Sequence, residues 1–361
     1  MKKLLFLSLL CVFFGDVYGQ KEVNASDTAK PKKKKLKPLF QEDDILQMDI
    51  VADLKTLLRD RGTKTHHHRA QLVYRSSEED SVILPLKLKV RGNFRRSPQN
   101  CVFPPLYVDL PKKIVKESIF EGQNRLKLVT HCQSEDYIFQ EYTVYKMYNL
   151  LTKYSFSVRL VQVNYISTTG KRDLQAKYAF FIEDEKDMAK RNKTKNYHLK
   201  QVPMQRIDSV NMATVAVFEY LIGNTDWSIP FLHNIKLLTK KGRQYPLAVP
   251  YDFDHAGLVE AKYARPAEQL ELTSVRQRLY RGLTYSPEIL NQVFDKFRQV
   301  KTSIYALYET NPRLSSGYIK RSLRYLDDFY KTIDNPKEVK KIFVYGGGKP
   351  EGAGVLMKGL N

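Results

Sequence analysis

The chain has 361 residues, enough for one large domain or two moderate ones with real cores. It carries 60 lysines and arginines against 39 aspartates and glutamates, a formal net charge of +21. Such an excess suggests an acidic partner: phosphates, an anionic membrane surface or an acidic protein. No nucleic-acid-binding motif accompanies the charge, so we expect no nucleic-acid partner.

The first residues predict export. MKKLLFLSLLCVFFGDVYGQ combines two lysines, an apolar run too short to cross a bilayer and a small residue at Gly19, which predicts a signal peptide over residues 1–19. Residues 20–38 are polar, basic and proline-flanked and predict a disordered spacer. No later stretch is long and apolar enough to cross a membrane. We therefore expect a periplasmic or extracellular protein without a transmembrane segment after signal cleavage.

Two cysteines remain beyond the signal, Cys101 and Cys132. In an oxidising compartment an isolated pair is more often a disulfide than two free thiols. The sequence therefore predicts a Cys101–Cys132 disulfide.

From about Phe40 to Leu110 the pattern is typical of strands. AQLVYR and SVILPLKLKVRG are rich in β-branched residues and flank the acidic turn SSEED, which predicts a hairpin. The consecutive residues His66–His68 precede the first strand, and we interpret them as a loop and not as a metal site. The second strand ends in RGNFRR, with Arg91 and Asn93 at a glycine turn. This turn either grips phosphate or is a solvated basic turn.

The next two elements are predicted to be a strand and a helix. RLKLVTH places Lys127 inside an apolar run, where its head must be paired or reach water. SEDYIFQEYTVYKMYNLL repeats apolar residues at helical spacing, with Glu141 in the middle. A strand lysine paired with a helix glutamate is the clamp by which kinases hold phosphates. The alternative is that Glu141 pairs with Lys146 or another surface base.

A second strand pair and a buried helix follow. SVRLVQVNYI and LQAKYAFFIE predict the strands, and the charged run DEKDMAKRNKTKN predicts a crossing between two lobes. SVNMATVAVFEYLIG predicts a helix that Gly223 ends. Asp226 would then lie just beyond the C-terminus of a buried helix.

The stretch NTDWSIPFLHNIKLLTKKGRQYPLAVPYDFDHAG is dense in side chains that can bind a metal or accept a proton. IKLLT and YPLAVPY read as strands around a Lys-Lys-Gly turn, so Asn234 and Asp252 should lie side by side at the open end of a hairpin. Asp226, then Asn234, then a hairpin, then Asp252-Phe-Asp254 is the order of parts in kinase-type phosphotransferases, where an Asp receives the hydroxyl proton and an Asn and a later Asp hold magnesium. The competing interpretation is a purely structural turn, since Asn, Asp and Gly are common turn residues.

After Gly257 the chain is predicted to be helical. SPEILNQVFDKFRQVKTSIYALY and SSGYIKRSLRYLDDFYKTI are both amphipathic, and the glycine-rich residues 346–361 predict a flexible tail.

From about Val90 to Gly257 the chain resembles the spore-coat protein H (CotH) kinases, atypical members of the protein-kinase-like superfamily. The matching order is RGNFRR, an apolar strand and helix, VQVNYI, YAFFIED, GNTDWSIPFLHN and VPYDFDHAG. The resemblance implies transfer of phosphate from ATP to a protein hydroxyl with Mg²⁺ or Mn²⁺. It makes Asp226 the catalytic residue and Asn234 and Asp252 the metal ligands.

The resemblance also implies supporting roles. Asp254 would be a supporting or alternative metal ligand, and Glu183 would lie at the nucleotide hinge. The strand after the RGN motif reads FPPLYVDL here, without the lysines usual in the family, so Lys127 is the substitute for the nucleotide lysine. Glu141, Arg91 and Asn93 complete the expected nucleotide contacts.

The expected fold class is α+β, a bilobal protein-kinase-like fold. Residues 39–185 would form the β-rich N-terminal region and N-lobe, and residues 186–345 a mainly helical C-lobe with the catalytic hairpin. The expected partner is an acidic or envelope-associated protein substrate. Two other functions stay open: a non-catalytic nucleotide- or partner-binding envelope protein with this fold, and a metal-dependent glycosyltransferase-like enzyme, which would predict a doubly wound α/β fold.

Overall fold

A computed structural model describes residues 36–75, 80–170 and 173–346. The predicted signal peptide, nearly all of the predicted spacer and all but the first residue of the predicted tail lie outside these ranges. Within them, no helix is both long enough and apolar enough to cross a membrane.

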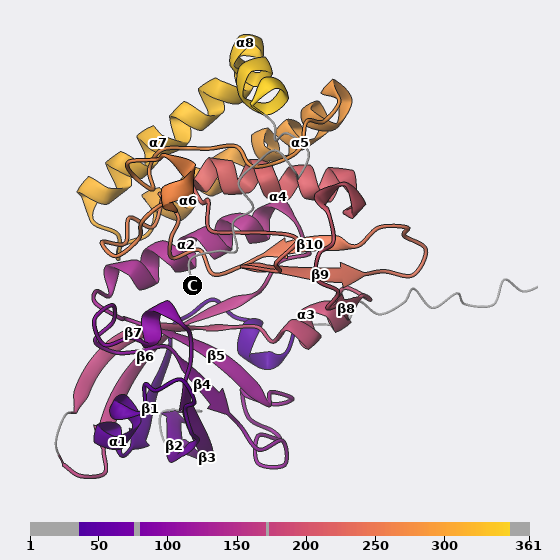
Figure 1. The fold of residues 1–361 in the computed structure, drawn as a ribbon. Helices are drawn as coiled ribbons and strands as arrows, with labels where there is room; N and C mark the ends of the chain where they lie inside the picture. Colours follow the sequence, from indigo (N-terminus) through magenta and orange to yellow (C-terminus); the bar gives the residue numbers. More distant parts are fainter. Residues whose placement is uncertain (1–35, 76–79, 171–172, 347–361) are drawn as a thin grey trace, which may run out of the picture. The chain divides into compact units, whose positions relative to one another are not determined.

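The N-terminal part is a closed barrel in the strand order β1-β2-β3-β4-β5-β7-β6 (Figure 1). Its neighbours pair antiparallel, except that β1 and β6 are parallel. The strands are β1 (Leu46–Ala52), β2 (His68–Arg75), β3 (Ser81–Val90), β4 (Leu106–Asp109), β5 (Arg125–Thr130), β6 (Val158–Ser167) and β7 (Leu174–Ile182). The predicted hairpin β2–β3 and the predicted pair β6–β7 are confirmed. A doubly wound parallel sheet is absent from the described ranges, which removes the fold argument for a glycosyltransferase.

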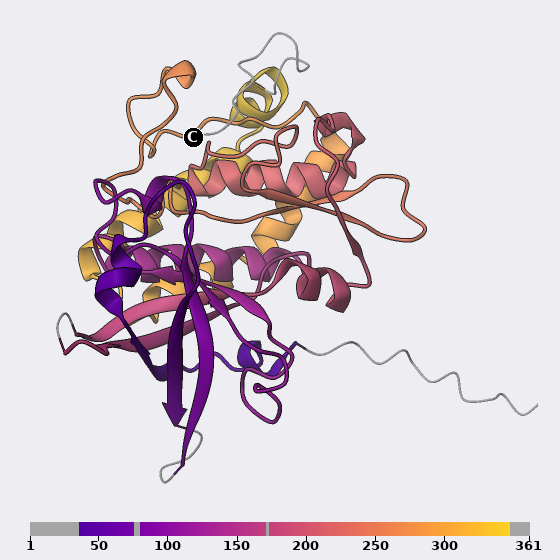
Figure 2. The same ribbon diagram turned by 60° about the horizontal axis from the view of Figure 1, so that its bottom comes forward.

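The C-terminal part is mainly helical and contains one small sheet, β10-β9-β8. Figure 2 shows its helices gathered on one side of the barrel. Within the described residues the helices are α1 (Leu54–Arg59), α2 (Asp136–Leu151), α3 (Glu185–Arg191), α4 (Ser209–Ile222), α5 (Pro287–Gln299), α6 (Lys301–Glu309), α7 (Ser316–Asp334) and α8 (Pro336–Val339). Short 3₁₀ turns (Pro38–Phe40, Phe94–Arg96, Met204–Arg206 and Glu268–Leu270), a π-helix (Lys340–Tyr345) and the strands β8 (Lys195–Tyr197), β9 (Ile235–Thr239) and β10 (Leu247–Pro250) complete the list. An α+β fold with a β-rich N-terminal region and a helical C-terminal part is therefore confirmed.

Two segments differ in detail from what the sequence predicts. The charged run predicted as a crossing forms α3 and then β8, which pairs antiparallel with β9. Asp184 caps α3 by accepting a hydrogen bond from the Lys186 amide, a local interaction that favours a helix despite the high charge. The amphipathic stretch after residue 286 is two helices, α5 and α6, which meet at Val300.

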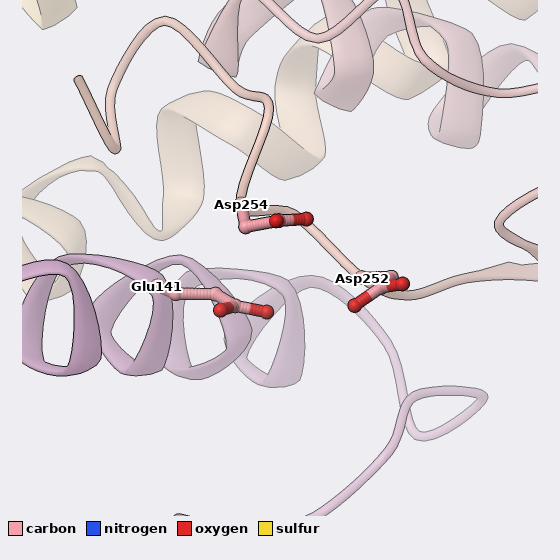
Figure 3. A group of neighbouring side chains, drawn as sticks. All are labelled: Glu141, Asp252 and Asp254. Carbon is pink, nitrogen blue, oxygen red and sulfur yellow. The ribbon is translucent and has the colours of Figure 1, made fainter. Parts of the chain in front are cut away.

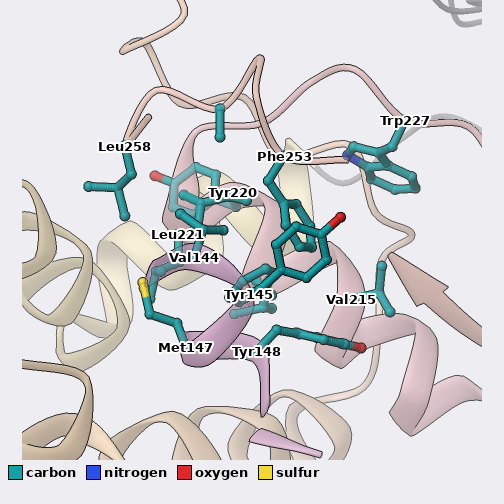
Figure 4. Packing of buried hydrophobic residues seen from close by; sticks show 14 of the residues in the cluster. Val144, Tyr145, Met147, Tyr148, Val215, Tyr220, Leu221, Trp227, Phe253 and Leu258 are labelled. Atoms are coloured by element: carbon teal, nitrogen blue, oxygen red, sulfur yellow. The ribbon is translucent and has the colours of Figure 1, made fainter. Parts of the chain in front are cut away.

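The larger hydrophobic core fixes the residues on which the site is built (Figure 4). Phe253 is fully buried and packs edge-on against Tyr145 of α2 and Phe218 of α4, with ring centres 4.8 and 5.6 Å apart. Trp227, 2% exposed, belongs to the same core. Because Phe253 is anchored inside, the aspartates on either side of it are held in place at the edge of this core.

The predicted disulfide between Cys101 and Cys132 is present. It joins the loop after the RGNFRR turn to Cys132, two residues beyond the end of β5, where Cys132 also forms an antiparallel bridge with Phe103. Such a bond fits the oxidising compartment that the predicted signal peptide implies.

Candidate functional site

The β9–β10 hairpin brings Asn234 and Asp252 together, as the sequence predicts. Pro250 is paired with Ile235, and the Tyr251 amide donates a 3.0 Å hydrogen bond to the Asn234 carbonyl. Asn234 and Asp252 therefore flank the last rung of the ladder. Both have positive φ, 50° and 64°, a conformation that Asn and Asp adopt more readily than most residues.

Asp226 is positioned from the end of α4. Gly223 ends this helix in the left-handed conformation, at φ 68°, as predicted. The Asp226 amide then donates to Asn224 Oδ1 at 3.0 Å, and Arg281 Nη1 donates to the backbone carbonyls of Thr225 and Trp227 on either side. The loop that carries Asp226 is thus fixed by the helix end and by a half-buried arginine.

The carboxylate of Asp226 contacts both His233 and Asn234. His233 Nε2 lies 2.8 Å from Oδ1, and Asn234 Nδ2 donates to Oδ2 at 3.0 Å and to the Asp226 carbonyl at 2.8 Å. Burial lowers the pKa of His233, but its hydrogen bond with Asp226 outweighs burial and raises that pKa. The amide nitrogen of Asn234 is engaged in these bonds, which leaves its Oδ1 as the atom available to a ligand.

A cluster of three carboxylates lies beside this pair (Figure 3). Glu141 of α2, Asp252 and Asp254 each offer one oxygen, and these atoms lie within 4.8 Å of one another. The Asp252 amide donates a 2.8 Å hydrogen bond to Tyr145 Oη, which ties the hairpin end to α2. Three carboxylates this close require a cation or a proton, because like charges at this distance disfavour ionisation.

Arg95 supplies a positive charge to the cluster. Its guanidinium is 3.3 Å from Glu141 Oε2, 3.0 Å from Asp252 Oδ1 and 3.3 Å from Asp254 Oδ2. Burial opposes its charge, but Asp254 and Glu141 outweigh burial and raise the pKa of Arg95. Arg95 was not singled out in the sequence. The signal was the run of arginines in RGNFRR, but sequence spacing could not show which of them turns inward.

The carboxylates respond differently to this environment. Burial raises the pKa of Glu141 to about 8 in spite of Arg95, and its Oε1 is buried without a hydrogen-bond partner. Burial also raises the pKa of Asp254. For Asp252, Arg95 and Arg91 outweigh burial and lower the pKa. Asp252 is therefore the member of the cluster that is most readily ionised.

The ion partner of Glu141 is Arg95, and Lys127 is placed elsewhere. Lys127 Nζ lies 4.5 Å from the centre of the Tyr251 ring. Burial, followed by the nearby charge of Arg91, lowers the pKa of Lys127 to about 8. In the described part of the chain Lys127 makes neither a hydrogen bond nor an ion pair, so the lysine–glutamate clamp is not formed here.

One cavity of about 530 Å³ collects most of the predicted site residues. It is lined by Arg91, Asn93, Lys127, Asp226, Asn234, Asp252 and Asp254, together with residues that the sequence did not point to: Arg95, Tyr107, Glu185, Lys236 and Tyr251. Glu183 does not line it. That carboxylate is buried and binds Arg191 at 2.8 and 2.9 Å and the Ser157 amide at 3.0 Å.

Comparisons with known proteins give a distant structural likeness. The proinflammatory kinase CtkA of Helicobacter pylori superposes with a TM-score of 0.41 and 12% sequence identity, over 65% of this chain and 94% of that one. No family model matches the chain, and no curated protein matches its sequence. The assignment of function therefore rests on the geometry of the site.

Proposed function

We propose that this protein is an exported atypical kinase that transfers phosphate from ATP to a hydroxyl of a protein substrate, with Mg²⁺ or Mn²⁺. The observation that carries the proposal is the convergence of Asp226, Asn234 and Asp252 in one cavity that Arg91 and Lys127 also line. A proton acceptor and two oxygen ligands, beside cations that match phosphate, are the parts that phosphoryl transfer requires.

The residues fit a divalent metal. Asn234 Oδ1 and the carboxylates of Asp252 and Asp254 are the hard oxygen ligands that Mg²⁺ and Mn²⁺ prefer. Glu141 does not line the cavity, but its Oε1 is buried without a hydrogen-bond partner, so the carboxylate cluster that it forms with Asp252 and Asp254 has unused acceptor capacity. A bound cation would neutralise the charge of the phosphates.

The proposed base is Asp226. With Oδ1 held by His233 and Oδ2 held by Asn234, its carboxylate is fixed in orientation, which is what a residue receiving a hydroxyl proton needs. Lys127 and Arg91 would bind phosphate oxygens, since both present positive charge to the cavity. Asn93 lines the same cavity from the turn after β3. Glu141, predicted as the partner of Lys127, would instead orient Arg95. The hinge role of Glu183 stays a proposal.

A second candidate is a nucleotide-binding protein without catalysis. It is favoured by Arg95, whose guanidinium already supplies a cation to the carboxylates on which a metal would bind. The net charge of +21 fits an acidic or envelope-associated protein partner under either function.

The test is transfer of labelled γ-phosphate from ATP by the purified mature protein, to itself and to an envelope extract. We expect transfer with Mg²⁺ or Mn²⁺, none with a chelator, and loss of both transfer and metal-dependent ATP binding in Asp252→Ala. Transfer that is insensitive to the chelator, or an Asp252→Ala variant as active as wild type, contradicts the proposed metal site. ATP binding without transfer favours the second candidate.

A further inference from the structure

The aromatic rings that line the cavity are already in contact with cations or other rings. Lys127 and Lys236 lie 4.5 and 5.5 Å from the centre of the Tyr251 ring. Arg91 and Arg125 lie 5.5 and 5.2 Å from the centre of the Tyr107 ring. Each tyrosine therefore has two positive groups within the range of a cation–π contact.

Phe94, the phenylalanine that lines the cavity, is also in contact with other rings. The ring of Phe94 packs against His255 and Tyr263, with ring centres 5.4 and 5.5 Å away. Pro105 and Leu232 are the aliphatic residues that line the cavity. A purine is usually held between apolar or aromatic surfaces. The cavity lining has few apolar or aromatic side chains that are not already packed against other groups.

The lining holds four cationic side chains and four carboxylates, and two of the cations, Arg91 and Lys127, form no ion pair within the described ranges. Arg91 Nη1 is buried without a hydrogen-bond partner, and Lys127 has no anionic partner within the described ranges. Lys236 is 3.0 Å from Glu185, so this third cation is partly neutralised. A buried guanidinium nitrogen with no acceptor is costly unless a ligand provides one. The chemistry that satisfies it is a chain of phosphate oxygens.

We propose that the cavity recognises the phosphate chain of the donor and not its base, so that ATP, GTP and inorganic tripolyphosphate are equivalent ligands. This inference rests on the proposed function for the identity of the site, but it concerns binding. For each donor the acceptor hydroxyl oxygen forms a bond to the terminal phosphorus as the bond to the bridging oxygen breaks. The hydroxyl proton passes to Asp226, and the leaving group is ADP, GDP or pyrophosphate.

The experiment is calorimetric titration of the mature protein with ATP, GTP and tripolyphosphate in the same magnesium buffer, with adenosine as a fourth probe. We expect the three dissociation constants to lie within about threefold of one another and adenosine not to bind. A stacked base typically contributes about 5- to 150-fold in affinity. ATP binding at least about fivefold tighter than tripolyphosphate, binding of adenosine, or no binding of tripolyphosphate each overturns the inference.

A charge variant sharpens the result. Lys236→Met removes a cation from the Tyr251 ring, and it should weaken all three phosphate ligands by the same factor. Lys241→Met, in the exposed β9–β10 turn, removes the same charge away from the cavity and should change none of them. Selective weakening of ATP by Lys236→Met contradicts the inference. If the three phosphate ligands bind equally but no phosphate is transferred, the inference holds and the proposed function is wrong. If phosphate is transferred but ATP binds much more tightly than the other two, the proposed function holds and the inference is wrong.

Discussion

At the scale of single residues, Arg95 connects the carboxylates of the site. It is 7% exposed and contacts three carboxylates that come from α2 and from the end of β10. A buried ion pair contributes little net stability compared with apolar residues, but removal of one partner leaves uncompensated charge. The effect of Arg95 on stability is therefore best measured by replacing its side chain with an uncharged one.

We expect Arg95→Met to lower the free energy of unfolding at neutral pH by roughly 3–5 kcal/mol, the usual cost of breaking a buried ion pair. The same variant should gain more thermal stability from Mg²⁺ than wild type does, because a metal can then replace the lost positive charge. Thermal denaturation with and without Mg²⁺ measures both effects. Arg96→Met is the matched control, since among the described residues the one hydrogen bond of its guanidinium goes to the Thr63 carbonyl, at 3.4 Å. Equal responses of the two variants to Mg²⁺ would show that the cluster does not bind metal.

His131 gives a pH-dependent contribution to stability. Burial lowers the pKa of His131 from its ordinary value of 6.5 to about 4, and its Nδ1 is buried without a hydrogen-bond partner beside Phe103. Between these two values the unfolded chain binds a proton that the folded chain does not, so stability falls as pH falls from 6.5 to 4.

His131→Gln removes this effect. Relative to the variant, the free energy of unfolding of wild type should fall by roughly 1–3 kcal/mol between pH 7 and pH 4.5. Urea denaturation of both proteins at several pH values measures the difference. A difference that is constant across this range would mean that His131 titrates normally in the folded protein.

At the scale of elements, the end of α4 determines where Asp226 lies. Gly223 has φ 68°, and a Cβ atom there would overlap the Tyr325 hydroxyl and lie 3.1 Å from the Val275 carbonyl oxygen. An L-residue at this position is therefore both strained and crowded.

We expect Gly223→Ala to lower the free energy of unfolding by roughly 2–4 kcal/mol, and Gly242→Ala by only about 1 kcal/mol. Gly242 has a similar φ of 81° in the β9–β10 turn, but no atom lies within 4 Å of its added Cβ. Chemical denaturation of the two variants isolates the crowding from the backbone strain. If both lose the same stability, the helix end is less tightly packed than the structure shows.

Local sequence patterns predicted the helices and strands that carry the site, but they did not predict its long-range contacts. The α4 helix, its stop at Gly223 and the β9–β10 hairpin follow from spacing and turn chemistry that lie within a few residues. The contacts of Arg95 join residues 46 and 157 positions apart, which no periodicity encodes. For the same reason the parallel pairing of β1 with β6, which closes the barrel, was not anticipated.

At the scale of the whole molecule, residues of the β-barrel and of the helical part line one cavity, in which we propose phosphoryl transfer. Asp226 decides between an enzyme and a binding protein, because a base acts on the transferred proton and not on the ground-state hold on ATP. Asp226→Asn keeps the shape of the side chain and removes the charge that accepts the proton.

The most direct measurement compares wild type and Asp226→Asn for transfer of labelled γ-phosphate, with metal-dependent ATP binding determined on the same samples. We expect the variant to bind ATP as wild type does and to transfer phosphate at least about a hundredfold more slowly. Equal transfer by the two proteins would contradict a role for Asp226 as the base. Binding by both proteins with transfer by neither would contradict the kinase proposal itself.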